Sequence, residues 1–364
     1  MRLSRCAIAT LLAVLPVVPA MAQENAEAPV LPTKPTFTFY IENDNYLGLK
    51  EGEDRFYTNG LRLAVQWPEC YLPETIRRQR GLRLPFVGDP SDADARVCPP
   101  RNPTLPEPPP PDRFRFSFGA ALGQNFYTPS DIKDPNLRRN DRPYAAWLYV
   151  GAILNLFDDR QAHTLELDLG TVGPRAQGEW VQSHWHRLID APQPRGWAHQ
   201  ISDEPALLLL YDARWRLIEF QHGEHKVFDL IPSAGGALGN VLTYGKVGAT
   251  ARLGWNIGSD FGPPGPLPSA FASRAVAPQR LELYLFAGAE GRGVVHNIFL
   301  DGNTFQRSHA VAKEDFVADL NWGIAARLDS IRLTWRQVRR SPEFIFQRDP
   351  EVFGAVTLTW GITQ

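Results

Sequence analysis

The chain has 364 residues, with 38 basic and 40 acidic side chains and a formal net charge of −2. This near balance, without a basic tail, gives no reason to expect a nucleic-acid partner. The mean hydropathy is −0.27, yet the chain contains 10 Trp, 10 Tyr and 20 Phe. Beyond the N-terminal segment, apolar residues mostly alternate with polar ones, and no run is long enough for a transmembrane helix.

The N-terminal segment, residues 1–22, has the features of a secretory signal. Arg2 and Arg5 form a positive start, residues 7–18 form an apolar stretch, and Ala20-Met21-Ala22 forms a small-residue cleavage motif. A membrane anchor is the alternative, but the apolar stretch is short for a spanning helix and a cleavage motif follows it. We therefore expect an exported protein.

The three cysteines of the chain are interpreted for an exported, oxidising compartment. Cys6 lies in the predicted signal, so Cys70 and Cys98 remain in the mature chain. In an oxidising exported compartment these two could form a disulfide that closes the segment between them, and two free thiols are the alternative. Two cysteines alone cannot build a zinc site.

Alternating apolar and polar residues predict about twelve strands, an even number typical of closed single-chain outer-membrane barrels. A soluble β-sandwich is the alternative, but it would not need so many long strands, or interfacial aromatic residues such as Trp67, Trp147 and Trp215. We predict an all-β fold, a twelve-stranded antiparallel up-and-down transmembrane β-barrel with a short helix in an extracellular loop. The predicted strands are residues 36–43, 60–67, 113–124, 144–156, 163–172, 206–219, 224–235, 241–257, 280–290, 316–328, 330–339 and, as the closing strand, 352–362.

A proline-rich insert, residues 68–111, interrupts the barrel, which we expect to span residues 23–364. Proline cannot join a sheet ladder and favours an extended connector. Counting connections places this insert and the second proline-rich stretch, residues 258–268, on the periplasmic side. We interpret the insert as a linker or a partner-docking loop.

Polar motifs recur at the same end of alternate predicted strands. Asn43 and Asp44 end the first strand, Thr58 lies in the Asp-Arg-Phe-Tyr-Thr-Asn-Gly motif that opens the second, and Lys133 follows the third. Because the connections of an up-and-down sheet alternate between two rims, these residues should share one rim. The sequence therefore predicts one candidate site there.

A helix is predicted over residues 175–189, on the same rim. Val181 and Trp185 follow apolar helical spacing, whereas Glu179, Gln182 and His186 lie on a separate face. One interpretation is a lid over a pocket. The alternative is an amphipathic loop helix resting on the membrane interface with a solvated histidine. The shared rim favours the lid.

These side chains suit ester hydrolysis by activated water. His186 can take a proton from water, Asp44 can help to hold a hard cation such as calcium, and Lys133 can stabilise an oxyanion. A serine nucleophile is the competing mechanism. The chain has no G-x-S-x-G motif, and neither Ser130 nor Ser183 has a convincing base and orienting group by sequence position.

The ordered series of motifs resembles the outer-membrane lipid A 3-O-deacylase family in type, order and spacing. The resemblance implies a twelve-stranded barrel of the outer membrane that requires calcium and removes the 3-linked acyloxyacyl chain of lipid A at its outward-facing rim. The motifs are Glu42-Asn43-Asp44, Asp54 to Gly60, Tyr127 to Ser130, Asp141 to Tyr144, Gly173-Pro174 with Glu179, Gln182 and His186, and Gly196-Trp197 with Gln200.

Site residues follow from this resemblance motif by motif. Asn43 and Asp44 match the family's pair near the calcium ion, Thr58 its rim threonine and His186 its general base. Lys133 matches the family's lysine, although the loop that carries it is shorter here than in the best-known members.

One feature departs from the family's pattern. Where some members have an acidic residue shortly after the histidine, this chain has Pro192, with Asp190 nearby. We expect a monomer that acts on lipid A or lipopolysaccharide. A non-catalytic barrel of the same ancestry, serving as envelope scaffold or adhesion protein, is the alternative.

Overall fold

The computed structural model describes residues 35–44, 56–68, 115–268, 270 and 279–361. The predictions for the signal segment, for Cys70 and Cys98, and for nearly all of the insert 68–111 concern residues outside these ranges. None of the described helices is long and apolar enough to cross a membrane.

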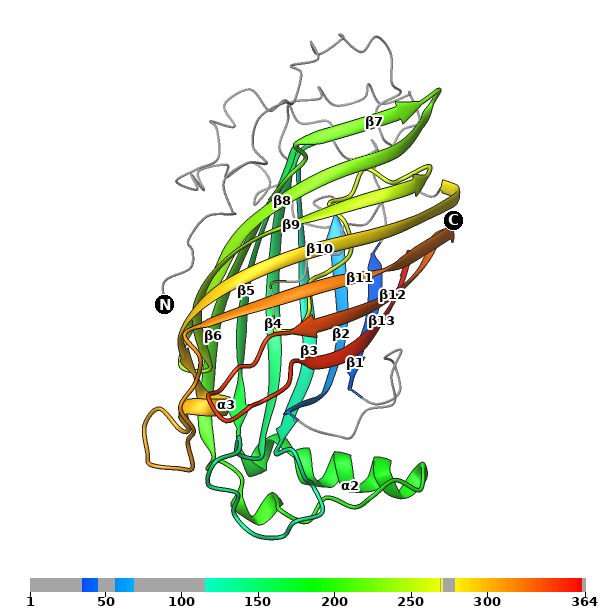
Figure 1. Cartoon of the computed structure of the whole chain (residues 1–364). Coiled ribbons are helices and arrows are strands. Elements are labelled where there is room, and N and C mark those ends of the chain that lie inside the picture. Colours follow the sequence, from blue (N-terminus) through cyan, green and yellow to red (C-terminus); the bar gives the residue numbers. More distant parts are fainter. Residues whose placement is uncertain (1–34, 45–55, 69–114, 269, 271–278, 362–364) are drawn as a thin grey trace, which may run out of the picture.

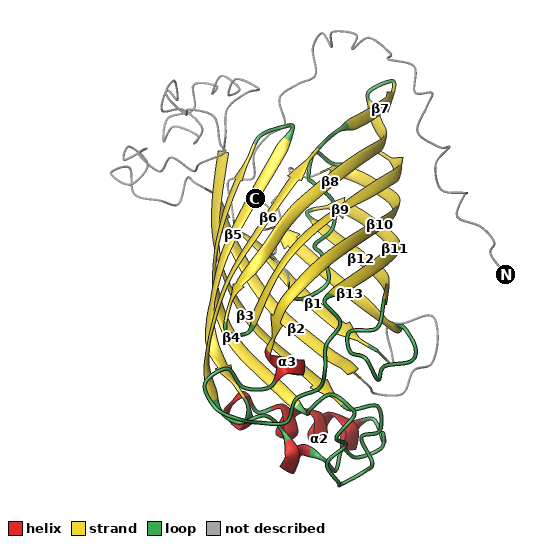
Figure 2. Cartoon of the chain, turned by 60° about the vertical axis from the view of Figure 1, so that its left-hand side comes forward, coloured by secondary structure: helices red, strands yellow, loops and turns green. Residues whose placement is uncertain are grey.

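Twelve strands form a closed antiparallel barrel, as predicted (Figures 1 and 2). Neighbours along the chain pair with one another, β1 pairs with β13, and the β6–β8 pairing closes the ring. The strands are β1 (Thr36–Asn43), β2 (Phe56–Pro68), β3 (Arg115–Thr128), β4 (Ala145–Phe157), β5 (Gln161–Val172), β6 (Glu204–Trp215), β8 (His225–Gly239), β9 (Leu242–Trp255), β10 (Gln279–Asn297), β11 (Phe316–Asp329), β12 (Ile331–Arg340) and β13 (Glu351–Gly361).

Side chains alternate between a polar lumen and an apolar outer surface. In β1, Thr38, Tyr40 and Glu42 are buried in the lumen, whereas Phe39 and Ile41 face outward. Exposed leucines cover the outside of several other strands. An apolar outer band around a polar interior is what a barrel in lipid requires.

Three expectations about strands and belt residues were wrong. The run 206–219 is not one strand, because it breaks after Trp215 and resumes as β7 (Ile218–His222), which pairs with β8. Strand β10 does not end at residue 290 but continues to Asn297. Glycines in this part of the strand interrupt the alternation of apolar and polar side chains. Trp147 is not an interfacial residue: it is fully buried and stacks on Tyr149, with ring centroids 4.1 Å apart. Half-exposed Trp215 fits the belt.

Long connections gather at one end of the barrel, which we call the loop-rich rim. They carry α2 (Gly178–Leu188) and the one-turn helix α3 (Ile298–Asp301), which is too short to leave a periodic signal in the sequence. Both views show α2 at this end, beyond the ends of β2 to β4.

The β9–β10 connection folds into the barrel, although the sequence suggested a plain connector at the opposite rim. Residues 257–268, here called the lumen strap, run along the inside of the cylinder (Figure 2), and almost all of them are buried. The backbone N–H of Leu267 donates to Glu42 at 3.1 Å, and the Tyr244 hydroxyl donates to the carbonyl of Pro268 at 3.0 Å. The strap therefore crosses much of the lumen.

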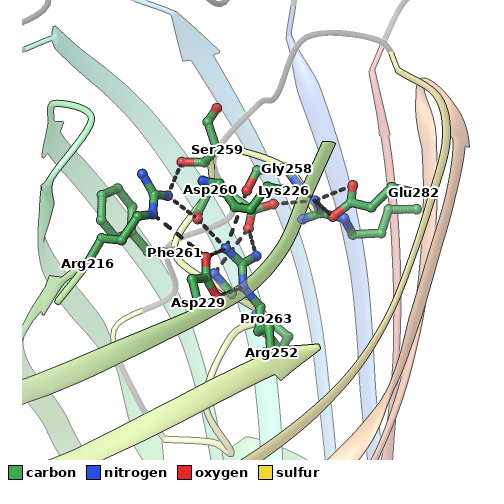
Figure 3. A network of polar contacts seen from close by, with 12 residues as sticks. Arg216, Lys226, Asp229, Arg252, Gly258, Ser259, Asp260, Phe261, Pro263 and Glu282 are labelled. Atoms are coloured by element: carbon green, nitrogen blue, oxygen red, sulfur yellow. Dashed lines mark hydrogen bonds and ion pairs between the residues drawn. The ribbon is translucent and has the colours of Figure 1, made fainter. Parts of the chain in front are cut away.

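Arginines of the wall hold the strap near the opposite rim (Figure 3). Arg252 lies 2.5 Å from the Asp260 carboxylate, which also contacts Arg332 and Arg327. Arg216 donates to the backbone carbonyl of Asp260 at 2.8 Å. Burial alone would raise the pKa of Asp260, but the surrounding arginines hold it well below its ordinary value.

Candidate functional site

The first part of the candidate site lies where β1 and β2 end at the loop-rich rim. Asn43 is the last residue of β1 and pairs with Asn59 of β2, and Asp44 follows it with only 3% of its surface exposed. Thr58 lies in β2 between Tyr57 and Asn59, where the register with β3 shifts. Neighbouring strands thus bring Asn43, Asp44 and Thr58 together, as the motifs predicted.

A β-bulge explains how β2 presents its polar end. Tyr57 and Arg62 are both buried in the lumen. In a regular strand their spacing would place the two side chains on opposite faces of the sheet. The extra residue at the register shift reverses the alternation. The backbone N–H of Tyr57 donates to Glu351 of β13 at 2.6 Å, which fixes this end of β2 beyond the end of β1.

The second part of the site is α2. We predicted a helix over residues 175–189, but a short 3-10 turn (Pro174–Ala176) comes first, and left-handed Gln177 separates it from α2. The first residue, Gly178, has no Cβ, and a Cβ there would lie 2.5 Å from the Trp197 ring. Gln124 of β3 donates to the Ala176 carbonyl at 2.7 Å, so the helix start is fixed to the barrel.

The two faces of α2 are reversed relative to a helix on a soluble protein. The polar residues Gln182 and His186 are buried, whereas Trp180 is 59%, Trp185 50% and Leu188 76% exposed. Such a helix is suited to an apolar medium on its outer side and a polar site on its inner side. The predicted polar face is confirmed for Gln182 and His186, and it is the inner one, but Glu179, which we expected on the same face, is exposed at the start of the helix.

The chain after α2 orients the His186 ring. Asp190 adopts a left-handed conformation (φ 57°), and the chain then turns back so that the Pro192 carbonyl lies 2.5 Å from Nδ1 of His186. Because a carbonyl can only accept, Nδ1 carries the proton, and in the neutral ring the lone pair is on Nε2. The backbone carbonyl of Pro192 thus supplies the contact that orients the ring.

The β3–β4 connection is attached to the same segment. The Ile132 carbonyl accepts from the Tyr144 hydroxyl at 3.1 Å and from the backbone N–H of Arg195 at 2.8 Å. Burial raises the pKa of Tyr144, so its hydroxyl remains a donor at neutral pH. Trp197 donates to Gln182 at 2.9 Å, which joins the segment to α2.

Lys133 follows Ile132 directly, and its side chain is exposed at the loop-rich rim. Its backbone N–H donates to Asp131 at 2.9 Å. The structure therefore attaches Lys133 to the segment that follows α2, while Asn43, Asp44 and Thr58 belong to the β1–β2 end. All five predicted residues lie at one rim.

The charged residues of the β3–β4 connection order the loop. Asp141 accepts from the Ser130 hydroxyl at 2.6 Å and from Arg138 at 3.2 Å, and Arg142 pairs with Glu343 at 3.1 Å. The Ser130 hydroxyl therefore bonds a carboxylate and an arginine instead of a histidine, which disfavours it as a nucleophile activated by His186.

The donors at the end of β1 are of the kind calcium takes. The carboxylate of Asp44 and the amide oxygen of Asn43 are hard oxygen ligands, and calcium takes several such ligands. Within the described ranges, no three His, Cys, Asp or Glu side chains gather closely enough to hold a metal ion. Asn43 and Asp44 can therefore provide part of a calcium site.

Three features of the site were not predicted from the sequence. They are the contact of the Pro192 carbonyl with His186, the turn at Asp190, and the hydrogen bond from Gln124 to the start of α2. Backbone groups leave no residue-type signal. An aspartate just after a predicted helix, followed two residues later by proline, was the available sign of a tight turn.

One protein family and several solved structures resemble this chain. The sequence pattern of the family described as outer membrane protein LpxR matches residues 7–362. LpxR from Salmonella typhimurium has a similar structure, with a TM-score of 0.67 and 21% identity over 90% of this chain and 100% of that one. The β domain of the Bordetella autotransporter BrkA is more distant, with a TM-score of 0.42 and 9% identity over 90% of this chain and 98% of that one. No curated protein sequence matches the chain.

The fold and its rim define an outer-membrane β-barrel protein. Because the family pattern covers nearly the whole chain, the chain belongs to the LpxR family of outer membrane proteins. The family resemblance drawn from the motifs is confirmed.

Proposed function

We propose that this protein is a lipid esterase of the outer membrane that removes the 3-linked acyloxyacyl chain from lipid A by hydrolysis. The reversed polarity of α2 carries the proposal, because it buries an oriented histidine beneath a helix whose outer face suits lipid. Membership of the LpxR family supports the substrate class.

In this proposal His186 is the general base. Nε2 takes a proton from water as the oxygen attacks the ester carbonyl, and the Pro192 carbonyl keeps the ring oriented and stabilises its protonated form. Lys133 stabilises the oxyanion, and Thr58 and Asn43 orient the substrate ester. The protonated ring then returns its proton to the leaving alkoxide.

The proposed site also includes a calcium ion. Asn43 and Asp44 would hold the ion, and bound calcium supplies Lewis-acid polarisation of the ester carbonyl. Burial of Asp44 favours a role for its carboxylate within the site rather than at the solvent surface.

The proposed orientation has the loop-rich rim facing outward. The exposed Trp180, Trp185 and Leu188 then lie at the level of the outer leaflet, where amphipathic aromatic rings are favoured. Lipid A would reach the site from the side, within the leaflet, and a single chain would suffice for activity.

Mass spectrometry of lipid A from cells that express the protein tests the activity. Wild type should yield lipid A lacking the 3-linked chain, and His186→Asn should abolish the change, since the base contributes about 10²–10⁴-fold. The matched control is His184→Asn, an exposed histidine on the same helix, which should behave as wild type. Unchanged lipid A in every strain would instead favour the non-catalytic scaffold.

The calcium proposal has a separate test on purified protein. Calcium should raise the melting temperature of wild type, because an ion that binds only the folded state stabilises it. The shift should vanish in Asp44→Asn and persist in Asp349→Asn, an exposed aspartate in the β12–β13 connection at the same rim. An equal shift in both variants would place the ion elsewhere.

A further inference from the structure

A small polar cavity lies inside the barrel, between the lumen strap and the wall. Its volume is about 30 Å³, and strands β6 and β8 to β12 contribute to its lining. One ordered water needs about 10–15 Å³ on a comparable measure. The cavity therefore has room for two waters or one anion of chloride size, and not for a phosphate group.

Arg336, in the middle of β12, brings an unbalanced positive charge to this cavity. Only 5% of its surface is exposed, and its Nε and Nη1 atoms make no hydrogen bond. Its guanidinium lies over the Phe286 ring, 5.3 Å from the centroid, and no carboxylate of the described residues forms an ion pair with it. Buried Glu42 and Tyr40 act on this guanidinium only at longer range, without an ion pair or a hydrogen bond to it. A buried charge without a direct partner is unfavourable, so Arg336 lacks an anion in contact with it.

The carboxylates that line the cavity already have cationic partners. Asp212 lies 2.8 Å from Arg214 and 2.8 Å from Lys246, and Lys246 also lies 2.9 Å from Glu290. The third lining carboxylate, Asp319, contacts an arginine of β10 and another of β12. These acids are therefore not the missing partner of Arg336.

The lumen strap closes the cavity on its inner side. Phe261, Pro263 and Pro266 contribute to the lining, and Arg214 donates to the carbonyls of Phe261 at 3.0 Å and Pro263 at 3.1 Å. These bonds place a second guanidinium beside the cavity. A resident of the cavity would therefore touch both the wall and the strap.

We propose that this cavity binds one small monovalent inorganic anion of chloride size, with Arg336 as its main ligand. The anion compensates the Arg336 charge and accepts the hydrogen bonds that Nε and Nη1 otherwise lack. It also stabilises the strap against the wall. The proposal is independent of the esterase activity, because these residues line the lumen and not the loop-rich rim.

Thermal unfolding of the purified, detergent-solubilised protein in two salts tests the proposal. At equal ionic strength, the melting temperature of wild type should be about 2 °C higher in 0.3 M sodium chloride than in sodium gluconate, whose anion is too large for the cavity. Arg336→Met should remove this difference. The matched control is Arg339→Met, which alters an exposed arginine of the same strand and should keep the difference.

Two results would overturn the proposal. Equal melting temperatures of wild type in both salts would mean that the cavity contains only water. A chloride effect that survives in Arg336→Met would mean that the anion binds elsewhere. If Arg336→Met does not fold, Arg336→Lys should fold with a weaker chloride effect, and wild-type crystals soaked in bromide should show an anomalous peak beside Arg336; absence of that peak would contradict the site.

Discussion

At the scale of single residues, the orientation of His186 depends on backbone geometry that follows the helix. The left-handed turn at Asp190 returns the chain so that the Pro192 carbonyl meets Nδ1. Asp, Asn and Gly tolerate this conformation, whereas β-branched residues do not. The identity of residue 190 should therefore affect catalysis without contacting substrate.

Substitution at Asp190 tests this positioning role. Asp190→Val should lower kcat about tenfold with little change in KM, because strain of about 1–3 kcal/mol displaces the Pro192 carbonyl from His186. Asp190→Gly accepts the same φ and should retain activity. Equal activity of the two variants in a purified lipid A assay would show that the turn does not position the base.

Another residue-scale feature is the Arg142–Glu343 pair, which joins the β3–β4 and β12–β13 connections. Burial alone would raise the pKa of Glu343, but Arg142 and then Arg340 lower it below the ordinary value of 4.5. A depressed folded-state pKa adds stability above the unfolded pKa, and this stability is lost as pH falls through the folded value.

The pH dependence of unfolding by urea tests this pair. Wild type should lose stability as pH falls below about 4.5, and Glu343→Gln should lose less over this range. At pH 7 the variant should already be less stable by about 3 kcal/mol, because it leaves Arg142 buried without its partner. A variant with the same pH profile as wild type would contradict the account.

At the scale of elements, the lumen strap is the feature that differs most from a simple barrel. Its Asp260 carboxylate contacts one arginine on each of three strands. Its backbone carbonyls accept hydrogen bonds from two further arginines, Arg214 and Arg216. The three arginines that contact Asp260 also pair with the wall carboxylates Asp229 and Glu282, which remain when Asp260 is removed. Removing the Asp260 carboxylate therefore deletes the ionic contacts between strap and wall and leaves the arginines in excess, so the strap should loosen from the wall.

Conductance across a planar bilayer measures this effect. Wild type should conduct little, because the strap occupies the lumen, and Asp260→Ala should show larger and noisier openings. The control Asp329→Asn removes the charge of an exposed aspartate at the rim opposite the loop-rich rim, keeps a residue that tolerates the left-handed backbone there, and should resemble wild type. If folded Asp260→Ala conducts as little as wild type, wall side chains, not this contact, close the lumen.

At the scale of the whole molecule, the apolar outer surface defines the medium in which the barrel works. Leu285 of β10 is 58% exposed and pairs with Leu253 and Ile324 on the adjacent strands, which also face outward. Such a stripe is stable in contact with lipid, whereas in water it would promote aggregation.

An arginine in this stripe tests the membrane setting. Leu285→Arg should lower the free energy of unfolding by about 2–4 kcal/mol in reversible folding into lipid vesicles. Phe305→Arg, at an exposed residue of the loop-rich rim, should cost much less. Equal costs at both sites would argue against a lipid-facing band at Leu285.

Period-two alternation and connection counting were sufficient to predict the barrel and the shared rim. They failed where side-chain pattern does not determine the path of the chain. Trp147 has an aromatic character that suits either face, the glycines near the end of β10 carry no alternation, and the strap is proline-rich whether it lies outside or inside the lumen. The polar and apolar faces of α2 were visible in the sequence, but which of them faces the barrel depended on the surrounding medium.

The most direct test of the central claim is an assay of purified protein on lipid A in mixed micelles with calcium, with the released acyl chain identified by mass spectrometry. We expect wild type and His184→Asn to release the 3-linked chain, and His186→Asn to release none. Release by His186→Asn at the wild-type rate would contradict the proposed role of His186 as the general base.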